Sequence, residues 1–105
     1  MNIKLHTVGI DADDYLNDFV QERVDKLELF YDRIVGSEVF LRIDGVSKTD
    51  DKVAEIKMMI PGKELFAKKQ GKSFEEAIDL AVEALKRQLQ KQKQKAQSKK
   101  SVPLL

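Results

Sequence analysis

The chain has 105 residues, of which 42% are hydrophobic and 35% charged, with a formal net charge of +1 and no cysteine. This length and composition suit a single domain with one packed core, and the absence of cysteine excludes disulfides, thiolate metal sites and thiol nucleophiles. No segment has the roughly 18 apolar residues of a membrane-spanning helix, and the N-terminus lacks the pattern of a signal peptide, so we expect a cytoplasmic protein.

Hydrophobic periodicity predicts a strand and then a helix in the first third of the chain. Residues 2–8 alternate between apolar and polar side chains, which is the period of a half-buried strand. Asp11 and Asp13 are candidate N-caps for the helix that follows, which we expect over residues 15–31. Its apolar side chains recur every three or four residues, as in an amphipathic helix that packs on a core: Leu16, Phe19, Val20, Val24, Leu27, Phe30 and Tyr31.

The middle of the chain alternates in the same way and predicts three strands. Gly36 and Ser37 should end the first helix, and the polar segment 44–52 should form a loop. Pro61 and Gly62 suit a tight turn, because proline fixes φ and glycine accepts a positive φ. The last two strands should therefore pair as a hairpin. The expected strands cover residues 39–43, 54–60 and 64–69.

A second helix should begin at residues 73–76, whose sequence SFEE has the form of a capping box. Its apolar stripe ends at Leu89, so the helix should extend beyond the core. The order β-α-β-β-β-α predicts an α+β fold, a two-layer sandwich in which both helices cover one face of a four-stranded, mostly antiparallel sheet. We expect this domain over residues 1–97 and a flexible tail over residues 98–105.

The residues that could support catalysis or bind a metal are sparse. His6, the only histidine, lies within a predicted strand and is interpreted as a surface or edge residue. The acidic group Asp11, Asp13 and Asp14 is explained by helix capping, and the sequence contains no phosphate-binding glycine loop. We therefore expect a protein that is not an enzyme and that uses no metal, cofactor or small-molecule substrate.

Charge is distributed unevenly along the chain. All 18 acidic residues lie at or before Glu83, whereas seven lysines and arginines follow it. Such an acid-free array attracts a polyanion, and nucleic acid is favoured over the alternative of a merely solvated end. Three lysines just before the second helix add another basic group: Lys68, Lys69 and Lys72. The candidate RNA-binding residues on the helix itself are Lys86, Arg87, Lys91, Lys93 and Lys95.

Two cations on the first predicted helix indicate where such a partner would bind. Arg23 falls inside the apolar stripe and Lys26 lies at its edge. A charge in that position can reach solvent, pair with a carboxylate such as Glu28 or Asp79, or face a gap between packed elements. In the last case the two cations would form one wall of a groove between the helices, with the basic half of the second helix as the other. Such a groove favours the phosphate backbone of folded RNA over base-edge reading of DNA.

Four segments, taken together and in this order, resemble the ribosome hibernation-promoting factor and protein Y family. They are VDKLELFYDRI (24–34), VFLRID (39–44), AEIKMMIPGKELFA (54–67) and AIDLAVEALKRQLQKQKQK (77–95). The resemblance implies a fold similar to double-stranded RNA-binding domains. It also implies a translation inhibitor that occupies the decoding channel of the small ribosomal subunit, at the messenger RNA, A-site and P-site positions. Such a factor promotes ribosome hibernation in stationary phase or stress.

The resemblance also implies contact residues and partners. Arg23, Lys26, Arg87 and Lys91 match contact positions for 16S rRNA by residue type. The expected partners are the small ribosomal subunit and whole ribosomes, with no membrane. The chain as given has neither the C-terminal dimerisation domain of long members nor the acidic tail of protein Y, so it resembles the short form and should be a monomer off the ribosome. The alternatives are a generic module for structured RNA, and a protein-interaction domain whose long helix docks a partner.

Overall fold

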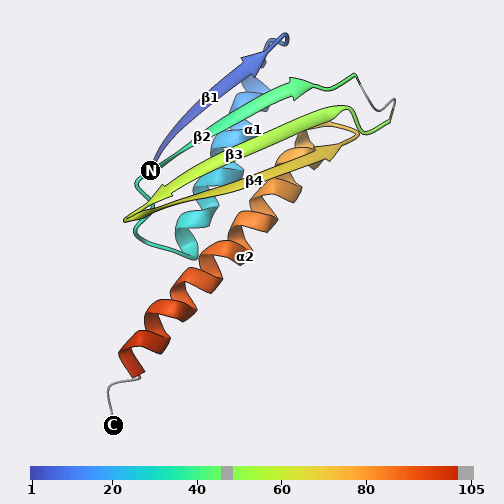
Figure 1. Cartoon of the computed structure of the whole chain (residues 1–105). Helices are drawn as coiled ribbons and strands as arrows, with labels where there is room; N and C mark the ends of the chain where they lie inside the picture. Colours follow the sequence, from blue (N-terminus) through green and yellow to red (C-terminus); the bar gives the residue numbers. More distant parts are fainter. Residues whose placement is uncertain (46–48, 102–105) are drawn as a thin grey trace.

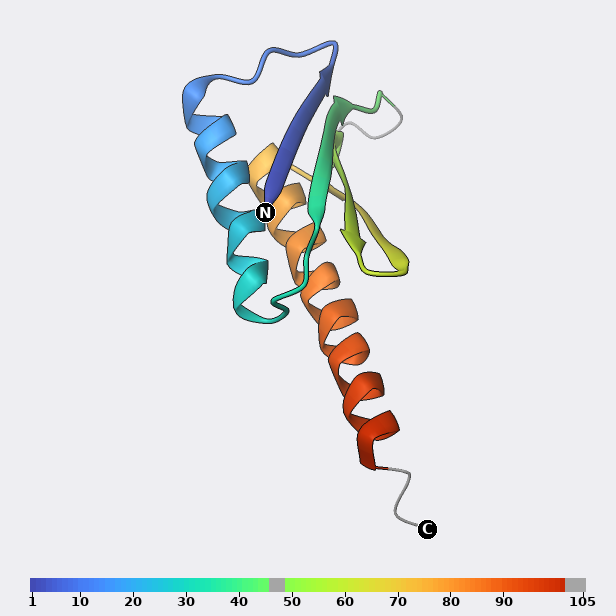
Figure 2. The same ribbon diagram turned by 90° about the vertical axis from the view of Figure 1, so that its left-hand side faces the viewer.

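Four strands form one sheet, and both α-helices cover the same face of it (Figure 1). This holds for residues 1–45 and 49–101, which the computed structural model of the chain describes. Figure 2 shows the two layers edge-on, with the sheet on one side and the helices on the other. The elements are β1 (Asn2–Val8), α1 (Asp14–Asp25), the 3₁₀ helix η1 (Lys26–Leu29), β2 (Gly36–Ile43), β3 (Lys52–Ile60), β4 (Lys63–Gly71) and α2 (Phe74–Ser101).

The strands lie in the sheet in the order of the sequence, β1-β2-β3-β4. β1 pairs with β2 in parallel, with Leu5 opposite Val39, whereas the β2–β3 and β3–β4 pairs are antiparallel. A parallel pair needs a long crossover, which α1 supplies between the first two strands. The predicted α+β sandwich with a mostly antiparallel sheet is therefore confirmed.

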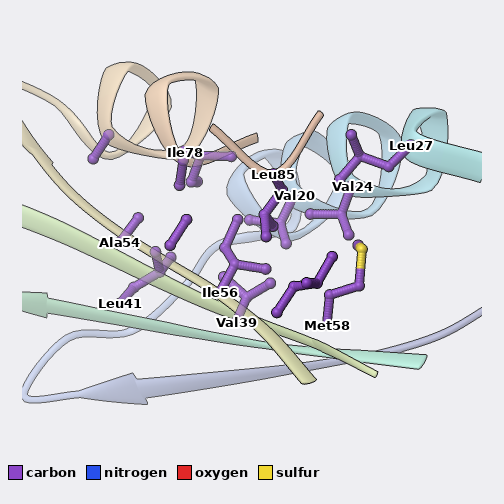
Figure 3. Close-up of a cluster of buried hydrophobic side chains, with 14 of the residues drawn as sticks. Val20, Val24, Leu27, Val39, Leu41, Ala54, Ile56, Met58, Ile78 and Leu85 are labelled. Atoms are coloured by element: carbon purple, nitrogen blue, oxygen red, sulfur yellow. The ribbon is translucent and has the colours of Figure 1, made fainter. Parts of the chain in front are cut away.

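The core lies between the helices and the helix-facing side of the sheet (Figure 3). Along β2 and β3 every second side chain is buried against the helices, as the period of two requires. Burial of each large aliphatic side chain contributes about 1.5–3 kcal/mol, so this layer fixes how the two helices lie relative to each other. The central side chains are Val20, Val24, Leu27, Val39, Leu41, Ile56, Met58, Ile78, Leu85 and Leu89.

The first helix differs from the prediction at its end. Asp13 is the N-cap, and its Oδ1 accepts a hydrogen bond of 2.8 Å from the Leu16 N–H. The α-helix then ends at Asp25 and continues as η1, so the predicted end at residue 31 was wrong. Gly36 lies in β2 rather than in a helix-ending turn. A Cβ on Gly36 would lie 3.1 Å from the Asn2 carbonyl oxygen, so the close approach of β1 explains this glycine.

The predicted hairpin is present, and so is the serine cap of the predicted capping box, whereas Glu76 bonds to the residue before Ser73 rather than to the Ser73 N–H. Gly62 has a φ of +77° in the turn between β3 and β4, which a residue without Cβ adopts at no steric cost. Ser73 Oγ accepts a hydrogen bond of 3.1 Å from the Glu76 N–H, and Glu76 Oε1 accepts one from the Lys72 N–H. The predicted loop 44–52 is shorter, because Lys52 already belongs to β3, and residues 46–48 lie outside the described part.

The second helix extends well past the sheet (Figure 1). Leu89 is fully buried, whereas the helix continues to Ser101. At a rise of 1.5 Å per residue this extension is about 18 Å long. The boundary at residue 98 between domain and tail stays a prediction, and residues 102–105 lie outside the described part of the chain.

Candidate RNA-binding site

A groove of about 280 Å³ lies between the first helical segment, formed by α1 and η1, and α2. Its position follows from the packing of both helices on the same face of the sheet. The groove combines three kinds of side chain, apolar, cationic and acidic. The apolar ones are Leu27, Phe30 and Val82, the cations are Arg23, Lys26 and Lys86, and the acids are Asp79 and Glu83.

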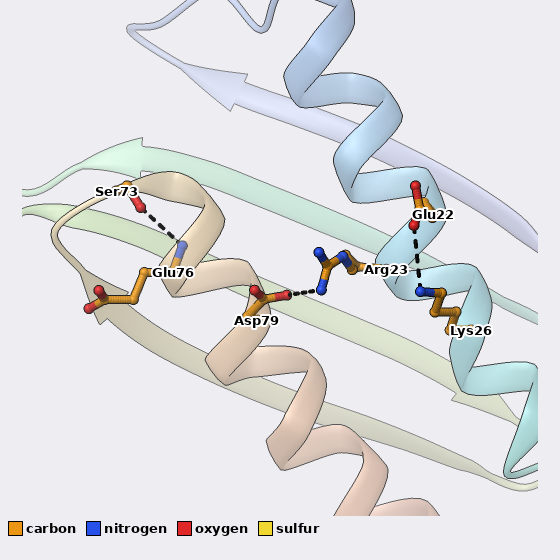
Figure 4. A network of polar contacts seen from close by, with 6 residues as sticks. All are labelled: Glu22, Arg23, Lys26, Ser73, Glu76 and Asp79. Atoms are coloured by element: carbon orange, nitrogen blue, oxygen red, sulfur yellow. Dashed lines mark hydrogen bonds and ion pairs between the residues drawn. The ribbon is translucent and has the colours of Figure 1, made fainter.

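Arg23 reaches across this groove to α2 (Figure 4). Its Nη1 lies 3.2 Å from Asp79 Oδ1, and its guanidinium lies over the Phe19 ring at 4.6 Å from the centroid. The side chains of Arg23 and Asp79 are 40% and 47% exposed, so water screens the ion pair. Exposed pairs of this kind contribute about 0.2–1 kcal/mol. Arg23 is therefore held weakly enough to exchange its carboxylate for another anion.

Glu28, the other carboxylate considered for Arg23, has a different partner. It accepts a hydrogen bond from the Met1 α-amine, and this contact raises the pKa of that amine above its ordinary value. Arg23 thus pairs with the carboxylate of Asp79 and also lies at the groove between the helices, which are two of the three possibilities considered from the sequence.

The groove residues Lys26 and Lys86 also have weak partners. Lys26 Nζ lies 3.5 Å from a carboxylate oxygen of Glu22, one turn earlier on α1, and its side chain is 56% exposed. Lys86 Nζ lies over the Phe30 ring, 4.6 Å from the centroid, in a cation–π contact. Neither contact neutralises a buried charge, so both ammonium groups remain available to an anionic partner.

The groove has a polarity along α2. Asp79, Glu83 and Lys86 are four and three residues apart, so they follow one another on the same side of the helix. The acids lie nearer the start of α2, and Lys86 lies about 10 Å further along the axis than Asp79. On α2 itself the Lys86 end attracts an anion and the Asp79 end repels one, while Arg23 on α1 offsets the charge of Asp79.

The other cations of α2 up to Lys95 lie outside the groove. Arg87, Lys91 and Lys95 are exposed and spaced four residues apart, so they form a row on another side of the helix. Lys93, seven residues after Lys86, continues the line of Lys86 beyond the groove. The expectation that the basic half of α2 forms the second wall was therefore wrong in part, since only Lys86 of this group lines the groove.

The three lysines before α2 are exposed, but they do not share one face of the sheet. Lys68 faces away from the helices, because it alternates with the buried Ala67, and it lies opposite Glu55 in the sheet. Lys69 and Lys72 are also exposed, near the end of β4. None of these three lysines lines the groove.

His6 is a surface residue on the edge strand β1, as the sequence suggests. Its Nε2 lies 2.9 Å from Glu38 Oε2, and its ring stacks on Phe40 with centroids 4.7 Å apart. Among the described residues, no group of three or more histidine, aspartate and glutamate side chains is placed to hold a metal ion. None of the described helices is both long enough and apolar enough to span a bilayer.

Sequence reasoning missed two of the groove's features. Glu83 was not considered, although its position four residues after Asp79 indicates that the two acids share a side of the helix. Phe30 was assigned to the core, but it is only partly buried and lines the groove beneath Lys86.

Comparison with known proteins identifies the family. Residues 3–97 match the family described as sigma 54 modulation protein / S30EA ribosomal protein. Ribosome hibernation promoting factors of Klebsiella oxytoca and Azotobacter vinelandii are 34% and 32% identical to this chain over 95 residues. These alignments cover 90% of this chain and 94% and 85% of the respective relatives.

Solved structures agree with the fold. The N-terminal domain of Thermus thermophilus Protein Y is 27% identical, with a TM-score of 0.76, and the match covers 87% of this chain and 98% of that one. A ribosomal subunit interface protein from Coxiella burnetii, 20% identical with a TM-score of 0.77, shares the fold over 89% of this chain and 98% of its own. The resemblance found in the sequence is confirmed, and the chain belongs to the sigma 54 modulation protein / S30EA ribosomal protein family.

Proposed function

We propose that this protein binds ribosomes and inhibits translation by occupying the decoding channel of the small subunit, as a ribosome hibernation factor of stationary phase or stress. The observation that carries the proposal is the match, over 90% of the chain, to relatives named ribosome hibernation promoting factor. The uneven charge of α2 supports it independently, because an acid-free row of cations on a projecting helix suits a polyanion such as 16S rRNA.

The proposed mechanism is occupancy without turnover. Arg23 would leave Asp79 and grip a phosphate with two parallel N–H donors, which a planar guanidinium does better than an ammonium. Lys26 and Lys86 would hold neighbouring phosphates at the groove. Each contact releases counterions from the RNA, so affinity should fall steeply with salt. Phosphate contacts fix position and orientation, and the volume of the bound protein then excludes messenger RNA and tRNA.

The rest of α2 would extend this contact surface. The row of Arg87, Lys91 and Lys95 lies on another side of the helix from Lys86 and Lys93. Because the helix projects by about 18 Å, RNA can contact it on two of its sides at once, one for each row of cations. Lys68, on the sheet face away from the helices, and Lys69 and Lys72, near the end of β4, would contact other RNA segments. We propose that the protein acts as a monomer through residues 1–97.

A charge-reversal variant tests the proposal. Arg23→Glu combined with Arg87→Glu should weaken binding to purified small subunits by about 100-fold or more, because two charge-assisted contacts are lost. Co-sedimentation measures binding, and circular dichroism checks that the fold is retained. The matched control is Lys4→Glu combined with Lys63→Glu, which reverses two exposed charges away from the groove. Undiminished co-sedimentation of the Arg23→Glu and Arg87→Glu double variant would exclude both the groove cation Arg23 and the outer row of Arg87 as RNA contacts.

Competition tests whether binding is specific for ribosomes. Small subunits should displace the protein from random duplex RNA at concentrations orders of magnitude below those of the competing duplex. Equal competition would instead indicate a generic module for structured RNA. A binding constant that hardly changes between low and moderate salt would indicate a protein-interaction domain, because phosphate contacts depend strongly on salt.

A further inference from the structure

The groove between the helices contains more than a phosphate site needs. Phosphates require cations, yet this groove also has an apolar part formed by Leu27, Phe30 and Val82. It further contains the carboxylates of Asp79 and Glu83, which repel phosphate. A partner that uses the whole groove must therefore present an apolar surface, hydrogen-bond donors and a negative charge together.

A nucleotide has these three properties. We propose that the groove binds one unstacked guanine nucleotide of RNA, with the base on Phe30 and Val82, its N–H edge at Glu83 and its phosphate at Lys86. The inference rests on the proposed function, because it names what the RNA presents to this groove. Single-stranded bases commonly stack on aromatic side chains, and every base has a face suited to this contact.

The size of the groove fits one nucleotide. Its volume is about 280 Å³, just below the range of about 300–1,000 Å³ typical of small-molecule sites. A base over Phe30 would replace the Lys86 ammonium, which now lies 4.6 Å from the ring centroid. The flexible stem of lysine allows that ammonium to turn toward the phosphate of the same nucleotide.

Glu83 determines the choice of base. It has no ion-pair or hydrogen-bond partner among residues 1–45 and 49–95, whereas Asp79 is engaged by Arg23. A carboxylate accepts two parallel hydrogen bonds, and the Watson–Crick edge of guanine offers two adjacent donors, N1–H and N2–H₂. Adenine and cytosine place a ring acceptor next to their amino group, and uracil has one donor between two carbonyls. Glu83 therefore favours guanine.

The helix spacing agrees with the orientation of such a nucleotide. Lys86 lies three residues after Glu83, a rise of about 4.5 Å on the same side of α2. The base edge would thus meet the acidic end of the groove and the phosphate its cationic end. The reverse orientation would place phosphate against two carboxylates, Asp79 and Glu83.

Nuclear magnetic resonance on the ¹⁵N-labelled full chain tests the inference. The probes are GMP, AMP, CMP, UMP and inorganic phosphate, and the readout is the amide shifts of Leu27, Phe30 and Val82. GMP should move these amides and bind about tenfold more tightly than UMP, the effect of one carboxylate contact to paired donors. Inorganic phosphate should leave the amides of Leu27 and Val82 in place.

The variant Glu83→Gln isolates the proposed contact. It should lower GMP affinity about tenfold, whereas phosphate binding should not weaken, because the variant removes a carboxylate that repels phosphate. The matched control is Glu64→Gln, an exposed acid on β4 outside the groove, which should retain the preference. Equal binding of all four nucleotides, amides that do not move, or a guanine preference that survives Glu83→Gln would each overturn the inference. The amide spectrum itself verifies that each variant is folded.

Small-subunit binding separates this inference from the proposed function. If GMP leaves the groove amides in place while Arg23→Glu with Arg87→Glu still abolishes co-sedimentation, the guanine site is wrong and the function stands. If GMP binds in the groove but that double variant co-sediments normally, the guanine site stands and the ribosomal role of the groove is wrong.

Discussion

Replacement of Asp79 by asparagine tests whether Arg23 exchanges its partner on binding. The variant keeps the size of the side chain but removes the charge 3.2 Å from the guanidinium. In water two unit charges about 4 Å apart interact by about 1 kcal/mol. With side chains 40% and 47% exposed, the pair should contribute only about 0.2–1 kcal/mol. The midpoint of thermal unfolding should therefore fall by no more than a few degrees.

Asp79→Asn should also change the free energy of RNA binding by a similar amount, but in the favourable direction. A phosphate that binds Arg23 must displace Asp79 and then lie near that carboxylate. Without the carboxylate, this cost of about 0.2–1 kcal/mol disappears, which corresponds to an affinity about 1.4-fold to fivefold higher. Fluorescence titration of labelled protein with purified small subunits at several salt concentrations measures the gain. The gain should shrink as salt rises, because screening weakens the contact between exposed charges.

The variant Asp18→Asn is the matched control. It removes the same charge from an exposed position on α1 that does not line the groove. Its effect should include only the long-range attraction between a more positive protein and RNA. If Asp79→Asn binds no more tightly than Asp18→Asn, Arg23 does not compete between the two anions. If it binds more weakly, Asp79 positions the guanidinium for the phosphate and the exchange is refuted.

Three further predictions concern the stability of the fold. Leu85→Ala empties a fully buried position between α2 and the sheet and should lower the free energy of unfolding in urea by about 2–5 kcal/mol; a loss below about 1 kcal/mol would contradict this role. Ser73→Ala removes the cap of α2 and should cost about 0.5–2 kcal/mol, which Ser73→Asp should restore. Glu28 raises the pKa of the Met1 α-amine above its ordinary value of 8.0. This contact therefore stabilises the protein below that value and is lost as pH rises through the raised pKa. From about pH 7 to about pH 10 the free energy of unfolding should fall more in the parent protein than in Glu28→Gln, and equal slopes would exclude the effect.

The order of elements and the layering of the fold could be predicted because local patterns and the final packing agree. Each strand alternates with one buried face, and Asp13 and Ser73 are caps whose side chains bond within their own turn. The end of α1 could not be predicted in the same way. Phe30 and Tyr31 keep the helical spacing and still pack against the core, although the α-helix has ended. Spacing reports which side chains face the core, and it does not report which backbone hydrogen bonds form.

The candidate site was predictable on one wall only. Arg23 stood out because a charge inside an apolar stripe needs a special environment, and that environment is the groove. The opposite wall depends on how α2 is rotated against α1, which is set by buried side chains such as Ile78 and Leu85. That rotation brings Asp79 and Glu83 rather than Arg87 into the groove. The apolar stripe of α2 indicates which side of the helix faces the core, but which flank of that stripe faces α1 depends on three-dimensional packing.

The projection of α2 gives the protein a long axis with charge of opposite sign at its two ends. The molecule measures 57 × 26 × 19 Å, the acids of α2 lie in its first three turns, and its cations lie beyond Glu83. Because its net charge is only +1, the protein as a whole is attracted weakly to a polyanion. Its charge asymmetry, however, makes the field of the polyanion orient the molecule. The free end of the helix should therefore arrive first, which raises the association rate constant and makes it sensitive to ionic strength. In the proposed function, the same helix that lines the groove would thus also speed the encounter with RNA.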